Sequence, residues 1–268
     1  MHLKRWITGL IALPGLIGFV YAGGVAFTVL VAAACAVCLW EYHRIVFHPS
    51  DIAAAARLRS LAFGTGLVML GVAHLDLPDL LLVVVACNVL AAALISILYF
   101  KTGPEVVGLV QKQIQGIVYI PLFLSFLIRL RLSPEGMTWI FFLLGLIFAG
   151  DTAAFYVGSY FGRHKLCSAV SPGKTAEGAL AGLAASVMVG GLFKYFSFAS
   201  LPWSLSLLFA LVVGAVGQVG DLFESELKRA SKVKDSGGIL PGHGGLLDRL
   251  DALLFAAPVA YLFRISVL

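Results

Sequence analysis

The sequence predicts an all-α protein, a polytopic bundle of about nine transmembrane helices with the N-terminus in the cytoplasm. Of the 268 residues, 60% are hydrophobic and only 12% are charged, whereas soluble domains carry about 25% charged residues. Mean hydropathy is +0.98, and long apolar runs recur along the whole chain. These observations indicate an integral membrane protein.

The apolar runs define the predicted spans, since about 20 apolar residues cross the hydrocarbon core. Residues 6–40 carry no charge and are too long for one helix, so we expect two spans that turn at Gly23-Gly24. The basic N-terminus resembles the start of a signal peptide, but no small-residue cleavage site follows, and we expect the first span to be retained. The further spans are predicted at residues 61–75, 80–100, 114–130, 137–161, 176–196, 201–222 and 250–268. Between them, residues 45–60 and 104–113 fit either short interfacial helices or solvated loops.

Lysine and arginine are distributed unevenly between alternate loops. With nine spans and an inside N-terminus, fifteen of the 19 fall on the cytoplasmic side and four on the other. Because cytoplasmic loops carry the excess of these residues, the bias supports both the count and the orientation. The net charge of +5 is explained by these loops and by contact with anionic lipid headgroups; nucleic-acid binding is not needed to explain it.

Charge is concentrated in residues 217–251, where six acidic and five basic side chains occur within 35 positions. Helical spacing places Asp221, Glu224 and Lys228 on one face, together with Ser225. Asp248 and Asp251 share a face in the same way. Clustered carboxylates repel one another unless they are neutralised, and oxygen ligands suit Mg²⁺. A divalent metal is the simplest explanation, and the cations interspersed among these acids would then face phosphate.

Glycines surround His243 in the segment PGHGG, residues 241–245. Glycine lets the backbone approach a ligand and expose its amide donors, and His243 is suited to donate to a phosphate oxygen or to act as an acid. A structural histidine and a solvated, salt-bridged surface are the alternatives. The glycine density favours a ligand site, because a solvated face does not require it.

Two further features lie upstream. Asp151 stands midway along a predicted span, where an ionisable group is costly and faces the bundle interior, a cavity or a partner; a structural carboxylate is the alternative. The loop 163–178 contains Gly-Lys-Thr, but the spacing of a P-loop and its preceding strand are missing. Phosphate contact by this loop stays open beside a purely topological role.

Residues 225–251 read SxLKRxxxxKDxGxxLPxHGGLxDRLD, and this pattern resembles the signature of the phosphatidate cytidylyltransferase (CDP-diacylglycerol synthase) family. GQVGDL from Gly217, DTxA from Asp151 and SPxKTxEG from Ser171 also resemble that family. Phe155 and Gly173 depart from it, standing where Tyr and Lys are common. The motifs cover the C-terminal half, so we expect one membrane domain, 1–268, in which residues 1–135 are mainly scaffold and residues 136–268 carry the catalytic motifs.

The resemblance implies transfer of CMP from CTP to phosphatidate, giving CDP-diacylglycerol and pyrophosphate, in a Mg²⁺-dependent homodimer of the cell (inner or plasma) membrane, in contact with membrane lipids. A second, monovalent cation is left open. The expected metal ligands are Asp221, Asp248 and Asp251. The expected catalytic residues are Asp221, Lys228, Arg229, His243, Asp248 and Arg249. The expected substrate-binding residues are Asp151, Ser171, Lys174, Thr175, Glu177, Ser225, Lys234, Asp235, Gly244 and Gly245.

Two other functions share some of these features. A CDP-alcohol phosphatidyltransferase also uses acidic residues and a divalent metal, but its DGxxAR string is absent from this sequence. A transporter of phosphorylated lipid or of anions would place charges inside a helical bundle, and inverted repeats would favour it. No such repeat is evident in the sequence.

Overall fold

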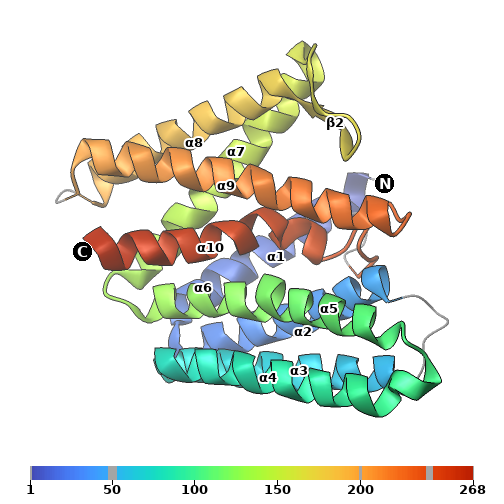
Figure 1. Cartoon of the computed structure of the whole chain (residues 1–268). Helices are drawn as coiled ribbons and strands as arrows, with labels where there is room; N and C mark the ends of the chain where they lie inside the picture. The colour runs from blue at the N-terminus through green and yellow to red at the C-terminus, as the bar shows by residue number, and fades with distance from the viewer. Residues whose placement is uncertain (1, 48–52, 199–200, 240–243, 268) are drawn as a thin grey trace. The chain divides into compact units, whose positions relative to one another are not determined.

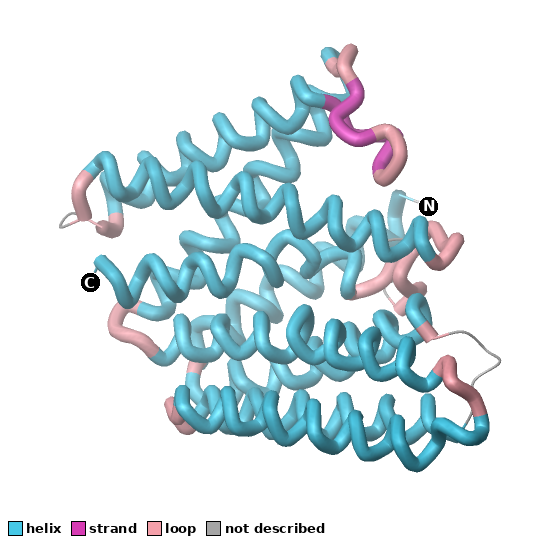
Figure 2. Tube along the Cα trace, viewed as in Figure 1, coloured by secondary structure: helices cyan, strands magenta, loops and turns pink. Residues whose placement is uncertain are grey.

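The structure, a computed structural model, describes residues 2–47, 53–198, 201–239 and 244–267 (Figure 1). Helices dominate the described residues, with one short pair of strands (Figure 2). The prediction of an all-α polytopic fold is therefore confirmed. The chain divides into two compact units, Met1–Leu132 with Ser231–Asp248, and Ser133–Ala230 with Arg249–Leu268; each is described by itself.

Eight helical segments in the described part of the chain are long and apolar enough to cross a membrane. The first predicted span corresponds to α1, of which Ala12–Ala22 counts as a shorter apolar helix. The predicted turn lies where expected, because α1 ends at Ala22 and α2 begins at Gly24. The exact count of nine stays a prediction.

The first unit packs its helices around α3, which contacts α2, α4, α5 and α6. Ala62, Met69, Leu81 and Ile117 form a buried cluster at its centre. The elements are α1 (His2–Ala22), α2 (Gly24–Val46), α3 (Ala53–His74), α4 (Pro78–Tyr99), η1 (Phe100–Thr102), α5 (Val106–Ile117), η2 (Val118–Leu122) and α6 (Phe123–Leu132).

One span of this unit is longer than predicted and irregular in its middle. The segments α5, η2 and α6 follow one another without a break and are together long and apolar enough to cross a membrane as one span, Val106–Leu132, so residues 106–113 are helical and continue into the predicted span. The π-helical turn η2 contains Pro121. Proline lacks an amide hydrogen and crowds the preceding turn, which explains why the helix widens at this point.

Gly23 and Arg131 shape the turn between α1 and α2. Gly23 has φ +62°, a conformation that glycine tolerates best. The guanidinium group of Arg131 donates to the carbonyl oxygens of Val20 at 2.7 Å and Tyr21 at 3.2 Å. Arg131 therefore satisfies carbonyls that the end of α1 leaves without a helical partner.

The second unit pairs α7 with α8 and α8 with α9. An aromatic cluster around Trp139 and Phe142, both fully buried, joins these helices. A short antiparallel hairpin, β1 with β2, precedes α8; the sequence did not indicate these strands. The elements are α7 (Gly136–Phe161), β1 (Lys165–Cys167), β2 (Ser171–Thr175), α8 (Ala176–Phe196), α9 (Trp203–Ala230) and α10 (Leu247–Val267).

Small residues let the helices of the second unit approach closely. A side chain on Gly182 of α8 would stand 2.9 Å from the carbonyl oxygen of Gly150 on α7. The hydroxyl of Ser186 donates to the carbonyl of Leu146 at 3.1 Å, and that of Ser206 donates to Gly190 at 3.1 Å. Close packing and interhelical hydrogen bonds are what hold helices together in lipid.

Candidate active site

Charged side chains from several elements of the second unit gather around Asp221. Asp221 lies on α9 and pairs with Lys174 at the end of β2, with 2.6 Å between Nζ and Oδ2. Asp151, on α7, interacts electrostatically with this pair and with Arg249. Asp251, on α10, interacts with Asp221 and Asp151 in the same way. The structure thus brings together three of the predicted carboxylates and two of the predicted cations.

The close approach of α9 to the start of α10 positions two of these acids. A side chain on Gly220 would stand 2.5 Å from the carbonyl oxygen of Asp251, so only glycine permits this spacing without a shift. Asp221 follows directly, and Asp251 is only 7% exposed. On α9, Gln218 also donates from Nε2 to the carbonyl of Ala179 on α8 at 2.9 Å. The backbones of three helices therefore fix where these carboxylates lie.

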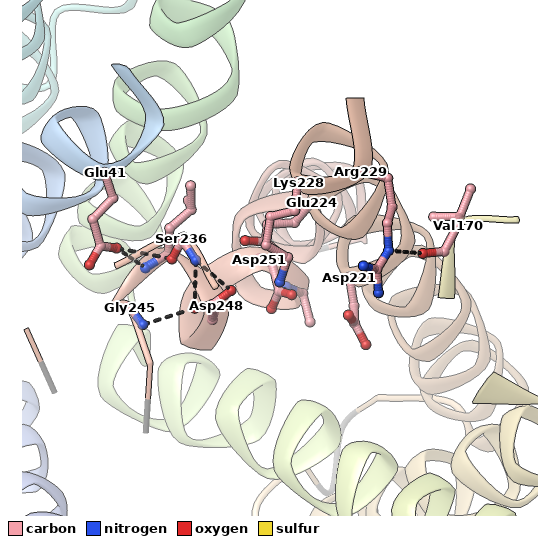
Figure 3. A network of polar contacts seen from close by, with 12 residues as sticks. Glu41, Val170, Asp221, Glu224, Lys228, Arg229, Ser236, Gly245, Asp248 and Asp251 are labelled. Atoms are coloured by element: carbon pink, nitrogen blue, oxygen red, sulfur yellow. Dashed lines mark hydrogen bonds and ion pairs between the residues drawn. The ribbon is translucent and has the colours of Figure 1, made fainter. Parts of the chain in front are cut away.

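The last turns of α9 carry a buried ion pair and a link to the hairpin. Glu224 is fully buried and forms an ion pair with Lys228, four residues later. Arg229 donates from Nε to the carbonyl of Val170, between the two strands, at 3.2 Å (Figure 3). Ser225 is half-buried on the same helix. Lys228 and Arg229, predicted as phosphate contacts, thus also have protein partners.

The hairpin is held in place by the first residues of α8. Glu177 accepts a hydrogen bond from the amide of His164 at 3.2 Å and lies 2.6 Å from the His164 ring nitrogen Nδ1. Thr175 caps α8, since its hydroxyl oxygen accepts from the amide of Gly178 at 3.2 Å. These predicted substrate residues hold β2, which begins with Ser171, in position at the start of the helix.

In the first unit, Asp248 organises the segment that precedes α10. Its carboxylate accepts hydrogen bonds from the amide of Ser236 at 3.1 Å and of Gly245 at 2.8 Å (Figure 3). Gly244, with φ +80°, provides the left-handed residue that the turn requires. Asp248 was predicted as a metal ligand, and in the structure it closes this loop.

Glu41 of α2 binds the same segment and was not singled out from the sequence. It is fully buried and accepts from the hydroxyl of Ser236 at 3.3 Å and from the amides of Leu246 at 3.1 Å and Leu247 at 2.7 Å. Figure 3 draws the carboxylate beside Ser236. A signal did exist, because Glu41 is the first charged residue after Arg5 in a long apolar run, and such residues are costly unless they have partners.

The remaining predicted residues lie around this segment. Lys234 and Asp235 are exposed in the turn after α9, and Gly245 is buried. His243 lies outside the described residues. Lys234 and Asp235 directly precede Ser236, whose amide is bound by Asp248. Asp248 therefore helps to position these two residues.

Carboxylate oxygens of the kind that bind Mg²⁺ are present in the site. Among the described side chains, no three or more His, Cys, Asp or Glu residues form a group that could hold a metal ion. Mg²⁺ is, however, commonly bound through one or two carboxylates together with substrate phosphates. Asp221 and Asp251 are two carboxylates that interact electrostatically, and Asp221 already pairs with the cation of Lys174.

Fold and site together define a polytopic helical membrane protein with a charged site suited to phosphates. The chain belongs to the cytidylyltransferase family, because the sequence model of that family matches residues 3–267. The family resemblance expected from residues 225–251 is therefore confirmed. The protein is an enzyme of the nucleotidyltransferase class.

Several relatives are named phosphatidate cytidylyltransferase. The protein from Bacillus subtilis is 32% identical over 268 residues, with 96% of each chain covered. That from Staphylococcus saprophyticus is 37% identical over 154 residues, 58% of each chain. That from Brucella suis is 45% identical over 131 residues, 49% of this chain and 48% of the relative.

Proposed function

We propose that this enzyme transfers the cytidylyl group of CTP to phosphatidate, forming CDP-diacylglycerol and pyrophosphate. The observation that carries the proposal is the relative from Bacillus subtilis, a phosphatidate cytidylyltransferase that aligns over 96% of both chains. The arrangement of Asp221, Lys174, Asp151 and Asp251 in a unit of membrane helices supports it. A membrane-embedded charged site suits a substrate with an anionic headgroup and two acyl chains.

The reaction is a single displacement at phosphorus. An anionic oxygen of the phosphatidate phosphate attacks the α-phosphorus of CTP and forms the new P–O bond. The bond from this phosphorus to the bridging oxygen of the β-phosphate breaks, and pyrophosphate leaves with the electron pair. The nucleophile is already ionised, so no serine or cysteine nucleophile is needed, and positioning with charge stabilisation carries the catalysis.

The chain's own residues have distinct tasks in this reaction. Lys174 and Arg249 would bind phosphate oxygens, as would Lys228, Arg229, Lys234 and His243. The backbone around Gly244 and Gly245 would approach the nucleotide. Asp151 would contribute a polar group to the site and orient the two cations with which it interacts, Lys174 and Arg249.

Mg²⁺ would be held by Asp221 and Asp251, with Asp248 as the third predicted ligand. When bound, it would neutralise charge on the phosphates and on the departing pyrophosphate. Because Lys174 already pairs with Asp221, the lysine would exchange this carboxylate for a phosphate oxygen when substrate and metal arrive.

We further propose that the site faces the cytoplasm of the cell membrane, where CTP is available, and that the enzyme is a homodimer. The distribution of lysine and arginine supports the orientation. The dimer follows from the family resemblance, and the mass of the detergent-solubilised protein tests it.

The decisive experiment incubates the purified protein with CTP, phosphatidate and Mg²⁺ and detects the lipid product by mass spectrometry. CDP-diacylglycerol is expected; a transporter would yield none. Asp221→Asn should lower turnover about a hundredfold, the scale on which one preorganised electrostatic group contributes. Asp76→Asn is the matched control, since Asp76 pairs with Arg129 at 3.2 Å in the first unit. Wild-type turnover of Asp221→Asn would refute the role of this acid.

A further inference from the structure

Glu41 is a buried carboxylate whose described hydrogen-bond donors all come from one distant segment. They are the hydroxyl of Ser236 and the amides of Leu246 and Leu247, 195, 205 and 206 residues away in sequence. Glu41 itself is fully buried near the end of α2. A buried carboxylate is tolerated only where such donors meet it, so the positions of Ser236, Leu246 and Leu247 and the position of this acid depend on each other.

Two glycines allow the segment to wrap around the carboxylate. A side chain on Gly237 would collide with Oε1 of Glu41. A side chain on Gly245 would collide with the hydroxyl of Ser236 and stand 2.7 Å from Oε2 of Glu41. Both glycines lie among the fixed positions of the pattern in residues 225–251. Their lack of side chains is therefore explained by Glu41 as well as by access to a ligand.

Asp248 fixes the same segment from within. It accepts from the amides of Ser236 and Gly245, while Glu41 receives the Ser236 hydroxyl and the amides that open α10. Glu41 and Asp248 thus both accept hydrogen bonds from Ser236 and from residues 245–247. Lys234, Asp235 and Gly244, all predicted to contact substrate, stand directly beside these fixed points.

We propose that Glu41 is a positioning residue of the nucleotide site. Its carboxylate holds Ser236, Leu246 and Leu247, and thereby the neighbouring Lys234, Asp235 and Gly244, in the positions from which these groups receive the phosphates of CTP. The inference rests on the proposed function. Glu41 acts through the backbone of this segment and does not itself touch the substrate.

The test compares Glu41→Gln with Asn88→Leu in the full-length enzyme. Glutamine keeps the shape of Glu41 but replaces one acceptor oxygen by an NH₂ group, which faces donors. Asn88 is 2% exposed and hydrogen-bonds Thr65 and Gln113 in the same unit, so it controls for the loss of a buried polar group. Glu41→Gln should raise the KM for CTP about tenfold, the effect of one lost hydrogen bond to a charged group, with a smaller change in the KM for phosphatidate. Asn88→Leu should leave both KM values unchanged.

Amide hydrogen exchange gives a readout that does not depend on activity. In Glu41→Gln, exchange should accelerate at Leu246 and Leu247 while α3 keeps its protection. Equal acceleration throughout the first unit would mean a purely structural role and would overturn the proposal. An unchanged KM for CTP in an active Glu41→Gln enzyme would overturn it too. Absence of product from the wild type would instead refute the proposed function.

Ser236→Ala refines the result, because it removes one donor and leaves the carboxylate. We expect the KM for CTP to rise about threefold. In the double variant with Glu41→Gln, the increase in the KM for CTP should be smaller than the product of the two single increases. Both substitutions remove the same hydrogen bond, between Ser236 and Glu41. A full multiplicative effect would contradict a direct link through this hydrogen bond.

Discussion

At the residue scale, the carboxylate of Asp221 is bound by a cation of the chain itself. Lys174 lies 2.6 Å away, and its side chain is 25% exposed. The lysine neutralises an acid that is also close to Asp151 and Asp251. A metal ion that uses Asp221 must therefore compete with Lys174, which makes the metal requirement sensitive to this lysine.

Lys174→Met should separate the two tasks of the lysine. Without the competing cation, the half-saturating Mg²⁺ concentration should fall about threefold or more, while kcat/KM for CTP falls about tenfold through the lost phosphate contact. Initial rates over a Mg²⁺ titration measure both. Lys165→Met, on the exposed strand β1, is the control. An unchanged Mg²⁺ requirement in Lys174→Met would speak against competition at Asp221.

Lys228→Ala should destabilise the protein in addition to any effect on phosphate binding. Glu224 is fully buried, and Lys228 is its ion-pair partner; breaking such a pair costs roughly 3–5 kcal/mol. The midpoint of thermal unfolding in detergent should drop by roughly 5–10 °C. The double variant Glu224→Gln, Lys228→Met should recover part of this loss. A single variant that melts like the wild type would show that the pair contributes little.

Residue types and spacing predicted some site residues better than others. Asp151, Lys174, Asp221 and Asp251 carry charge in or beside apolar runs, and the structure brings them together. The hydrogen bonds made by Glu41 could not be predicted, because two of their donors are the backbone amides of Leu246 and Leu247, and the direction of an amide is set only by the folded chain.

At the element scale, the lengths of the apolar runs predicted the helices, but they did not predict where each helix begins and ends. The span predicted at residues 61–75 begins earlier, at Ala53. Arg57 and Arg59 marked its expected start, yet both are good helix formers and lie against the rings of Tyr99 and Phe47. The hairpin of β1 and β2 escaped prediction because its strands are only three and five residues long and the second is rich in turn residues.

Gly182→Ala tests the close packing of the second unit. The new methyl group would stand 2.9 Å from the carbonyl oxygen of Gly150, and overpacking of this kind costs about 1–3 kcal/mol. The midpoint of thermal unfolding should fall. Gly71→Ala in α3 is the control, because a methyl group there would meet no atom within 4 Å, and alanine favours helix. Equal midpoints for the two variants would argue against tight packing at Gly182.

At the scale of the whole molecule, both units are assembled from separate parts of the sequence. The chain leaves the second unit after Ala230, contributes residues 231–248 to the first, and returns at Arg249. The pattern in residues 225–251 is therefore shared between the units. The sequence alone does not predict this division, because the composition of residues 231–248 does not indicate that they belong to the same unit as α2.

The predicted membrane orientation can be tested by labelling single cysteines in intact cells. In a variant without the native Cys35, Cys38, Cys87 and Cys167, a cysteine at Ser133 should react with a membrane-impermeant maleimide. A cysteine at Ser231 should react only after the cells are opened, because positive-inside topology places this loop in the cytoplasm. The reverse pattern would invert the orientation.

The hydrogen bonds of Glu41 also have a consequence for biosynthesis. Their donors lie 195–206 residues further along the chain, and at typical elongation rates about 10–40 s pass before the ribosome adds them. During this interval Glu41 is a carboxylate near the end of α2 whose described hydrogen-bond donors have not yet been synthesised. The hydrogen bonds that tie Ser236, Leu246 and Leu247 to α2 can therefore form only after almost the whole chain has been made.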